Sequence, residues 1–115
     1  MKNLFNSQIC TSRSQSERLL ALGLKKETAD MHWCKHSATK VWYMVCHPCD
    51  GVGDCIPAWS LHCLVSMIEE DFQSNGRFFC LPMFGFDKSD NLYDNIIDAY
   101  EWLIKEGYFN KEYLV

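Results

Sequence analysis

Hydrophobic residues near the C-terminal end of the chain repeat with the spacing of an α-helix. Between Asn91 and Glu106, apolar and aromatic residues share about 160° of one helical face, and charged residues fill the opposite face. The apolar positions are Leu92, Tyr93, Ile96, Ile97, Ala99, Tyr100, Leu103 and Ile104. The pattern predicts an amphipathic helix capped by Ser89 or Asp90 and ended by Gly107. We expect a small sheet to cover its apolar face.

A second helix is expected near the N-terminus. The run Ser14-Gln15-Ser16-Glu17 has the pattern of a capping box, in which the first and fourth residues cap each other's backbone N–H groups. Gly23 is a natural stop, because glycine enters the left-handed region without penalty. Residues 26–32 are expected to add a short turn.

A third helix is predicted in the run IPAWSLHCLVSMIEE, residues 56–70, with Pro57 in its first turn. Its core stripe contains Ala58, Leu61, Leu64, Val65 and Ile68. Trp59 and Cys63 fall on the opposite side of this helix.

Two runs are typical of β-strands. Residues 40–45 (KVWYMV) are rich in branched and aromatic side chains, and residues 77–81 (RFFCL) form a second strand candidate that Pro82 limits. Together with the helices they predict an α+β fold of two layers, with about three helices packed on a small, mostly antiparallel sheet. At 115 residues the chain is expected to be a single domain, 1–115.

Composition and charge narrow the function classes. The apolar share of 48% and charged share of 23% are typical of a globular protein. Residues 1–50 carry seven Lys/Arg and four Asp/Glu (+3), and residues 51–115 carry four and eleven (−7), which sum to the formal −4. We expect no nucleic-acid partner, because the cations form no clustered face. No apolar run approaches the ~20 residues that cross a bilayer, so we expect no membrane partner.

The start of the chain lacks the apolar core of a secretory signal. We therefore expect a cytoplasmic protein whose seven cysteines are reduced.

The segment VCHPCDGVGDC, residues 45–55, carries the candidate chemistry. Cys46 and Cys49 form a CxxC pair, which is half of many zinc sites. His32 and His36 could supply the other half, and Cys55 could replace one ligand. No cofactor is our first expectation, with zinc as the alternative.

The same CxxC pair could run thiol–disulfide chemistry, because a strand that leads into CxxC is how thioredoxin-like enzymes present their cysteines. That arrangement needs a helix to open at the second cysteine, whereas Asp50, Gly51, Gly53 and Asp54 follow Cys49 here. The two carboxylates would raise the thiol pKa and oppose reactivity. We interpret the segment as a loop that connects a strand to a helix.

Several aromatic residues lie outside the core stripes. Trp59 and Trp102 are off the predicted apolar arcs, and either an internal layer or a partner could cover them. Tyr108 and Phe109 open an apolar tail, residues 108–115, that could dock on the body or on a partner chain.

Three blocks of the sequence together carry a resemblance to known proteins: QSERLLALGLKKETADM (15–31), IPAWSLHCLVSMI (56–68) and DNLYDNIIDAYEWLIKEGYF (90–109). They resemble a group of small proteins of gut anaerobic bacteria, encoded near prophage or other mobile-element genes, whose function is unassigned. The resemblance covers about half of the chain and implies an α+β domain. It transfers no functional residue.

The sequence therefore predicts a non-enzymatic interaction or accessory domain that binds a protein partner or forms a homo-oligomer. The alternative is a zinc-stabilised Cys/His module. Thiol–disulfide chemistry at the CxxC pair is the third hypothesis.

Overall fold

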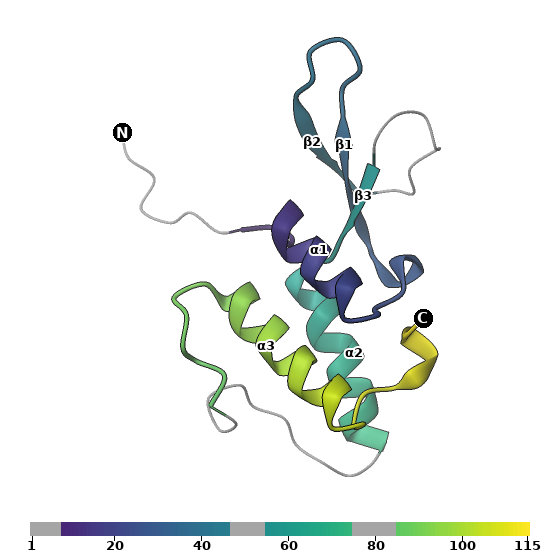
Figure 1. Ribbon diagram of the computed structural model, residues 1–115, viewed down its shortest axis with the longest axis vertical. Helices are drawn as coiled ribbons and strands as arrows, with labels where there is room; N and C mark the ends of the chain where they lie inside the picture. The colour runs from purple at the N-terminus through teal and green to yellow at the C-terminus, as the bar shows by residue number, and fades with distance from the viewer. Residues whose placement is uncertain (1–7, 47–54, 75–84) are drawn as a thin grey trace.

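The computed structural model describes residues 8–46, 55–74 and 85–115. Within these residues there are three α-helices and three strands. The elements are α1 (Arg13–Ala21), the 3₁₀ turn η1 (Lys26–Thr28), β1 (Met31–Lys35), β2 (Trp42–Val45), β3 (Cys55–Ala58), α2 (Leu61–Ser74), α3 (Leu92–Lys105) and the 3₁₀ turn η3 (Lys111–Tyr113). The predicted α+β class is confirmed. Figure 1 shows the helices gathered in one body and the sheet extending beyond it.

The three strands form one antiparallel sheet in the order β2-β1-β3. The predicted strand at 40–45 is confirmed as β2. The central strand β1 includes Met31 and His32, which we expected to lie in a short turn over residues 26–32. The turn is confirmed only at η1, and its predicted extension to residue 32 is wrong. The second predicted strand, 77–81, lies outside the described residues.

Helix α1 begins two residues earlier than predicted. Its N-cap is Ser12, whose Oγ accepts the N–H of Gln15 at 3.2 Å, while Gln15 Oε1 accepts the N–H of Ser12 at 2.9 Å. The capping box is therefore Ser12 with Gln15, and the prediction of Ser14 with Glu17 is wrong. The predicted stop is confirmed, because Gly23 follows the helix with φ +101°.

The start of α2 also differs from the prediction. Pro57 lies in β3, opposite His32, and is not part of the helix. The helix starts at Leu61, and the hydroxyl of Ser60 accepts the N–H of Cys63 at 3.1 Å, as an N-cap does. Proline is tolerated in β3 because β3 is an edge strand of the sheet.

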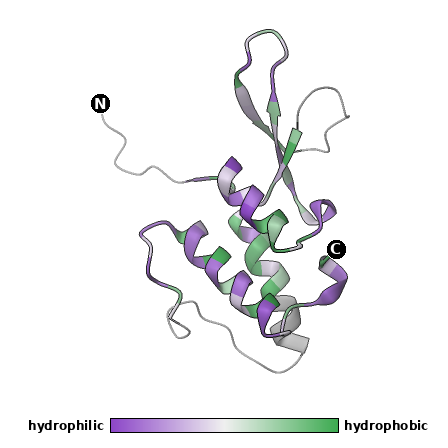
Figure 2. Cartoon of the chain, in the orientation of Figure 1, coloured by the Kyte–Doolittle hydropathy of each residue, from purple (hydrophilic) through white to green (hydrophobic). Residues whose placement is uncertain are grey.

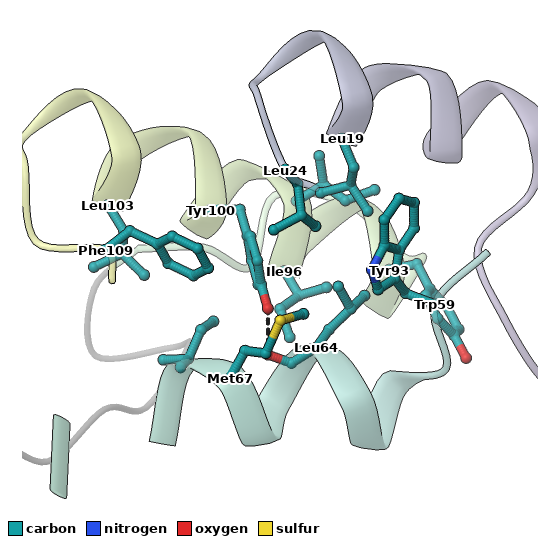
Figure 3. Packing of buried hydrophobic residues seen from close by; sticks show 12 residues of the cluster. Leu19, Leu24, Trp59, Leu64, Met67, Tyr93, Ile96, Tyr100, Leu103 and Phe109 are labelled. Atoms are coloured by element: carbon teal, nitrogen blue, oxygen red, sulfur yellow. Dashed lines mark hydrogen bonds between the residues drawn. The ribbon is translucent and has the colours of Figure 1, made fainter. Parts of the chain in front are cut away.

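The main hydrophobic core lies between the three helices. Figure 3 shows side chains from α1, α2 and α3 meeting there, and Figure 2 shows that hydrophobic residues predominate along the described part of α2. The buried members are Leu19, Leu24, Trp59, Leu64, Met67, Ile68, Tyr93, Ile96, Ile97, Tyr100, Leu103 and Phe109. The predicted stripe of α3 is thus confirmed except at Leu92, which is 47% exposed. The stripe packs against α1 and α2 instead of covering the sheet.

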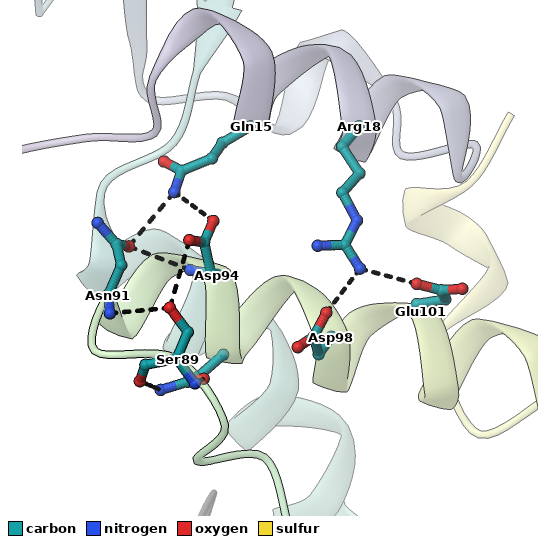
Figure 4. A network of polar contacts seen from close by, with 8 residues as sticks. Gln15, Arg18, Ser89, Asn91, Asp94, Asp98 and Glu101 are labelled. Carbon is teal, nitrogen blue, oxygen red and sulfur yellow. Dashed lines mark hydrogen bonds and ion pairs between the residues drawn. The ribbon is translucent and has the colours of Figure 1, made fainter.

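A row of polar contacts fixes α1 against α3 (Figure 4). Gln15 Nε2 donates to Asp94 Oδ1 at 2.7 Å and to Asn91 Oδ1 at 3.3 Å. One turn further along α1, Arg18 forms ion pairs with Asp98 at 2.6 Å and Glu101 at 2.8 Å. Asn91 also accepts the N–H of Asp94 at 3.1 Å, so Asn91 caps α3 and the predicted cap at Ser89 or Asp90 is wrong.

A smaller cluster attaches the sheet to the start of α1. Cys10, Met31 and Ala58 are buried together, and Trp33 and Met44 pack against them. Trp33 Nε1 donates to the carbonyl oxygen of Thr11 at 2.8 Å. One face of the sheet is therefore anchored to the N-terminal side of α1.

The C-terminal tail docks on the body, as one of our two expectations had it. Leu114 forms an isolated bridge with Leu24, and the N–H of Val115 donates to the carbonyl oxygen of Gly23 at 2.7 Å. Across residues 8–46, 55–74 and 85–115, none of the helices has both the length and the apolar character that crossing a bilayer requires.

Candidate functional site

The candidate site is the three-stranded sheet, because it combines an open strand edge with a pair of contacting sulfur atoms. The backbone hydrogen bonds define which groups face outward. His36 donates its N–H to the carbonyl oxygen of Val41 at 2.9 Å. Since this bonding alternates along an antiparallel ladder, Cys34 and His32 also direct their backbone groups toward β2.

The same alternation leaves one side of β2 open. Tyr43 and Val45 pair with Cys34 and His32, so the backbone N–H and C=O groups of Trp42 and Met44 point away from β1. No strand among the described residues pairs with this outer edge, since β2 ends the sheet. An edge of this kind accepts a further strand through main-chain hydrogen bonds.

The opposite edge of the sheet is chemically different. Pro57 in β3 pairs with His32, whose backbone groups face β2, so the nitrogen of Pro57 lies on the outer side of β3. Proline carries no N–H, which removes a donor from that edge and discourages strand addition. Of the two edges, that of β2 is therefore the better acceptor.

Exposed apolar side chains and cations surround the edge of β2. Val41 is 59% exposed and Tyr43 is 46% exposed. The guanidinium carbon of Arg13 lies 4.7 Å from the ring centroid of Trp42, and Nζ of Lys35 lies 5.8 Å from it. Both cations are within cation–π range of the ring, which holds them beside the strand.

These cations are not neutralised by carboxylates of the described chain. The ion pairs found in the described ranges are those of Arg18 with Asp98 and Glu101. Residues 31–49 contain no Asp or Glu. The hairpin of β1 and β2 is therefore a basic surface on a chain that is acidic overall.

The second feature of the sheet is the contact between Cys34 and Cys55. These residues are directly opposite on β1 and β3, and their sulfur atoms lie 3.2 Å apart. Cys34 is buried, with 7% of its surface exposed. Cys55 is disulfide-bonded, which contradicts our expectation that all of the cysteines are reduced.

Two other cysteines are thiols in protected places. Burial raises the pKa of Cys10 to about 11, with smaller contributions from the charges of Asp30 and Cys46. Burial likewise raises the pKa of Cys63 to about 11, again with a contribution from Asp30. Because the thiolate is the nucleophile, both are poor candidates for thiol chemistry near neutral pH.

The residues predicted as zinc ligands are placed as follows. His32 and Cys55 lie on the sheet, Cys46 directly follows β2, and Cys49 lies outside the described residues. His36 begins the hairpin turn, where its Nδ1 accepts the N–H groups of Ala38 and Thr39 at 3.2 Å each. The described ranges contain no group of three or more His, Cys, Asp or Glu residues arranged to hold a metal ion. Zinc binding stays a prediction.

Of the aromatic residues predicted to be available for contact with a partner, one pair is buried and the other pair is exposed. Trp59 is fully buried and its Nε1 donates to Thr28 Oγ1 at 2.9 Å, so of the two covers that we expected for it, an internal layer or a partner, the structure shows the internal one. Phe109 is also buried, 5.0 Å from the ring centroid of Tyr100. Trp59 was misplaced because we assigned it to a helix that in fact begins after it.

Trp102 and Tyr108 are exposed, and their ring centroids lie 5.5 Å apart. Phe86 lies 6.2 Å from Trp102 and extends this aromatic surface. The role of this aromatic surface in binding a partner protein stays a prediction.

The sequence interpretation missed Cys34 and the strand that carries it. The available signal was the alternation of Met31, Trp33 and Lys35 with His32 and Cys34, followed by a short polar turn before β2. No protein-family model, curated protein or solved structure matches this chain. The resemblance to mobile-element proteins therefore stays a prediction.

Proposed function

We propose that this chain is a non-enzymatic protein-interaction domain that binds an extended, acidic segment of a partner protein as an additional strand beside β2. The observation that carries the proposal is the outer edge of β2, where the backbone groups of Trp42 and Met44 point away from the sheet. Strand addition needs no catalytic group, because main-chain hydrogen bonds supply the affinity.

The charges around this edge favour an acidic segment. Arg13 and Lys35 lie beside the ring of Trp42, and Lys40 is in the turn that precedes β2. A strand that pairs with β2 would place every second side chain on the face that carries these cations. Glutamate or aspartate at those positions would gain charge-assisted contacts.

A second copy of the chain is a poorer occupant of the same edge. A second β2 strand paired about a two-fold axis would bring no Asp or Glu of its own hairpin to these cations, because residues 31–49 contain none. It would therefore lack the charge complementarity that an acidic strand offers. The proposal therefore commits to a different protein as the partner.

The proposal can be tested with two synthetic peptides, one of alternating valine and glutamate and one of alternating valine and lysine. With the ¹⁵N-labelled protein at low salt, the glutamate peptide is expected to slow hydrogen exchange at the amides of Trp42 and Met44. The effect should weaken as salt is added, because the charges at the edge are screened. The lysine peptide is expected to leave both amides unchanged.

A charge reversal and its matched control sharpen the test. Lys35→Glu is expected to weaken binding of the glutamate peptide about five- to tenfold, because it replaces an attraction with a repulsion. Lys111→Glu makes the same charge change at an exposed position of η3 and is expected to have no effect. Equal protection by both peptides, or protection confined to residues away from β2, would contradict the proposal.

A further inference from the structure

Sulfur-containing side chains gather on the face of the sheet that packs against the start of α1. Cys10 and Met31 are buried together there, and Met44 packs against them. The thiol of Cys10 donates to the thioether sulfur of Met44, and the two sulfur atoms lie 3.0 Å apart. The two residues are 34 positions apart in the sequence, so it is the fold that brings a thiol and a thioether into contact.

Cys46 belongs to the same group. It comes two residues after Met44 at the end of β2, so the two side chains project from the same face of the extended chain. The register between β1 and β2, continued by one step, places Cys46 level with Met31. Burial contributes most to the raised pKa of Cys10, and the charges of Asp30 and Cys46 raise that pKa further. Cys46 is therefore close enough to Cys10 for their charges to interact.

The group is open to solvent on one side. Cys46 is an exposed thiol and Met44 is half-buried, whereas Cys10 is only 2% exposed. An ion that arrives from solvent can therefore meet Cys46 and Met44 first and reach Cys10 behind them.

The distances suit a metal ion after a small adjustment. Metal–sulfur bonds of about 2.3 Å in a three-coordinate arrangement place the sulfur atoms about 4 Å from each other. Cys10 and Met44, at 3.0 Å, would need to separate by about 1 Å, and rotation of the unbranched methionine side chain supplies that movement.

The ligand types select the class of metal. Thiolate and thioether sulfur atoms are soft ligands, and together they favour a soft ion such as Cu(I). Zinc takes cysteine, histidine and carboxylate ligands in proteins, so methionines beside the cysteines do not indicate a zinc site.

We propose that these four side chains form a binding site for a soft monovalent metal ion of the class of Cu(I) and Ag(I). Cys10, Met44 and Cys46 are the first three ligands, and the thioether of Met31 is a fourth. Each cysteine that binds releases its thiol proton, so one bound ion is accompanied by two protons in solution. No electron is transferred, and the ion keeps its charge. The site shares Cys46 with the zinc site that the sequence suggested, and it takes none of the other residues of that site.

A bound ion would join the sheet to the helical body. Cys10 comes before α1, whereas the other three ligands belong to the two paired strands β1 and β2 or directly follow them. Because the ion binds only where these segments meet, it would stabilise the folded state.

The test follows the methionine methyl groups of the full chain, labelled with ¹³C, while Ag(I) is added in a chloride-free buffer as a probe that undergoes no redox reaction. The five methionines are assigned with single Met→Leu variants. One equivalent of Ag(I) is expected to shift the methyl signals of Met44 and Met31. The signal of Met67, which is buried in the core between the helices, is expected to stay unchanged.

Matched variants show which sulfur atoms bind. The affinity for Cu(I) is measured without oxygen, by competition with a chromophoric Cu(I) chelator. Cys46→Ser and Met44→Leu are each expected to lower the affinity about tenfold or more, because each removes one soft ligand. Cys46 is exposed, so its substitution leaves the core intact. Cys63→Ser and Met67→Leu make the same changes elsewhere and are expected to leave the affinity unchanged.

Methyl signals of Met44 and Met31 that do not respond to one equivalent of Ag(I) would overturn the proposal, and these residues would then be an apolar cluster only. So would an affinity for Cu(I) that Cys63→Ser lowers as much as Cys46→Ser does, or an equal response of the Met44 signal to Zn(II). Strand addition at β2 is measured at backbone amides and metal binding at side-chain methyl groups, so the two proposals can fail independently.

Discussion

The phenol hydroxyl of Tyr100 donates a hydrogen bond of 2.6 Å to the backbone carbonyl oxygen of Leu64 and so joins α3 to α2 (Figure 3). Both residues are fully buried. Burial raises the pKa of Tyr100 well above its ordinary value, since a charged phenolate has no solvent there. The contact fixes the rotation of α3 against α2, because it specifies one atom on each helix.

Removal of that hydroxyl tests the contact. Tyr100→Phe is expected to lower the free energy of unfolding by about 1–2 kcal/mol, because the ring stays packed while one buried hydrogen bond is lost. Urea denaturation followed by tryptophan fluorescence measures the change. Tyr108→Phe, at an exposed tyrosine, is the control and should leave stability nearly unchanged. Equal effects of the two substitutions would contradict the assignment.

A carboxylate in place of Gln15 is expected to separate α1 from α3. Gln15 Nε2 donates to Asp94 Oδ1 at 2.7 Å, and Gln15→Glu replaces that donor with a second negative charge. We expect a loss of about 1–3 kcal/mol at pH 7. The repulsion raises the pKa of the introduced carboxyl in the folded state, so the loss should shrink as the pH falls through that pKa. Gln15→Met, which removes the donor without adding charge, should show no such recovery.

The hairpin turn offers a stabilising substitution. Lys40 has φ +61°, in the left-handed region, where a side chain costs about 1–2 kcal/mol relative to the right-handed one. Lys40→Gly is expected to raise the free energy of unfolding by about 0.5–1 kcal/mol, after the larger chain entropy of glycine is subtracted. Lys40→Ala removes the same charge but keeps Cβ, so thermal unfolding should show no comparable gain.

Alkaline pH is expected to destabilise the fold through its buried thiols. The pKa values of Cys10 and Cys63 rise from 9.0 to about 11 on folding. Between those values the unfolded chain loses protons that the folded chain keeps, so stability is fully present below pH 9 and falls as the pH rises toward 11.

Urea denaturation at intervals across this range measures the fall. Cys10→Ala and Cys63→Ala should each flatten the slope against pH. Cys46→Ala, at an exposed cysteine, should leave it unchanged. A slope that none of these substitutions alters would show that other groups are responsible.

Much of the helical structure could be predicted because its signals are local. The apolar stripe of α3 and its end at Gly107 follow from residues within a few turns of each other. The ends that were predicted wrongly are those where several residues could cap. Ser12 and Ser14 each precede a suitable partner by three residues, and only the docking of Gln15 on Asp94 favours the first.

The sheet was harder to predict, because its pattern is short and its partners are distant. Met31–Lys35 contains five residues, too few for alternation to stand out from a turn. From the local sequence, Pro57 was assigned to the first turn of a helix. Its place on an edge strand depends on its pairing with His32, which is 25 residues away and gives no local signal.

The amino-acid sequence by itself determined which segments become helices and that the chain forms an α+β fold, since periodicity and end signals act over a few residues. Tertiary structure decided what those helices cover, which strand edge has no partner strand among the described residues, and that Cys34 meets Cys55 across 21 positions of sequence. Such contacts arise from the packing of the whole chain, because the free energy of burying α3 against α1 and α2 is shared among residues that no local window contains.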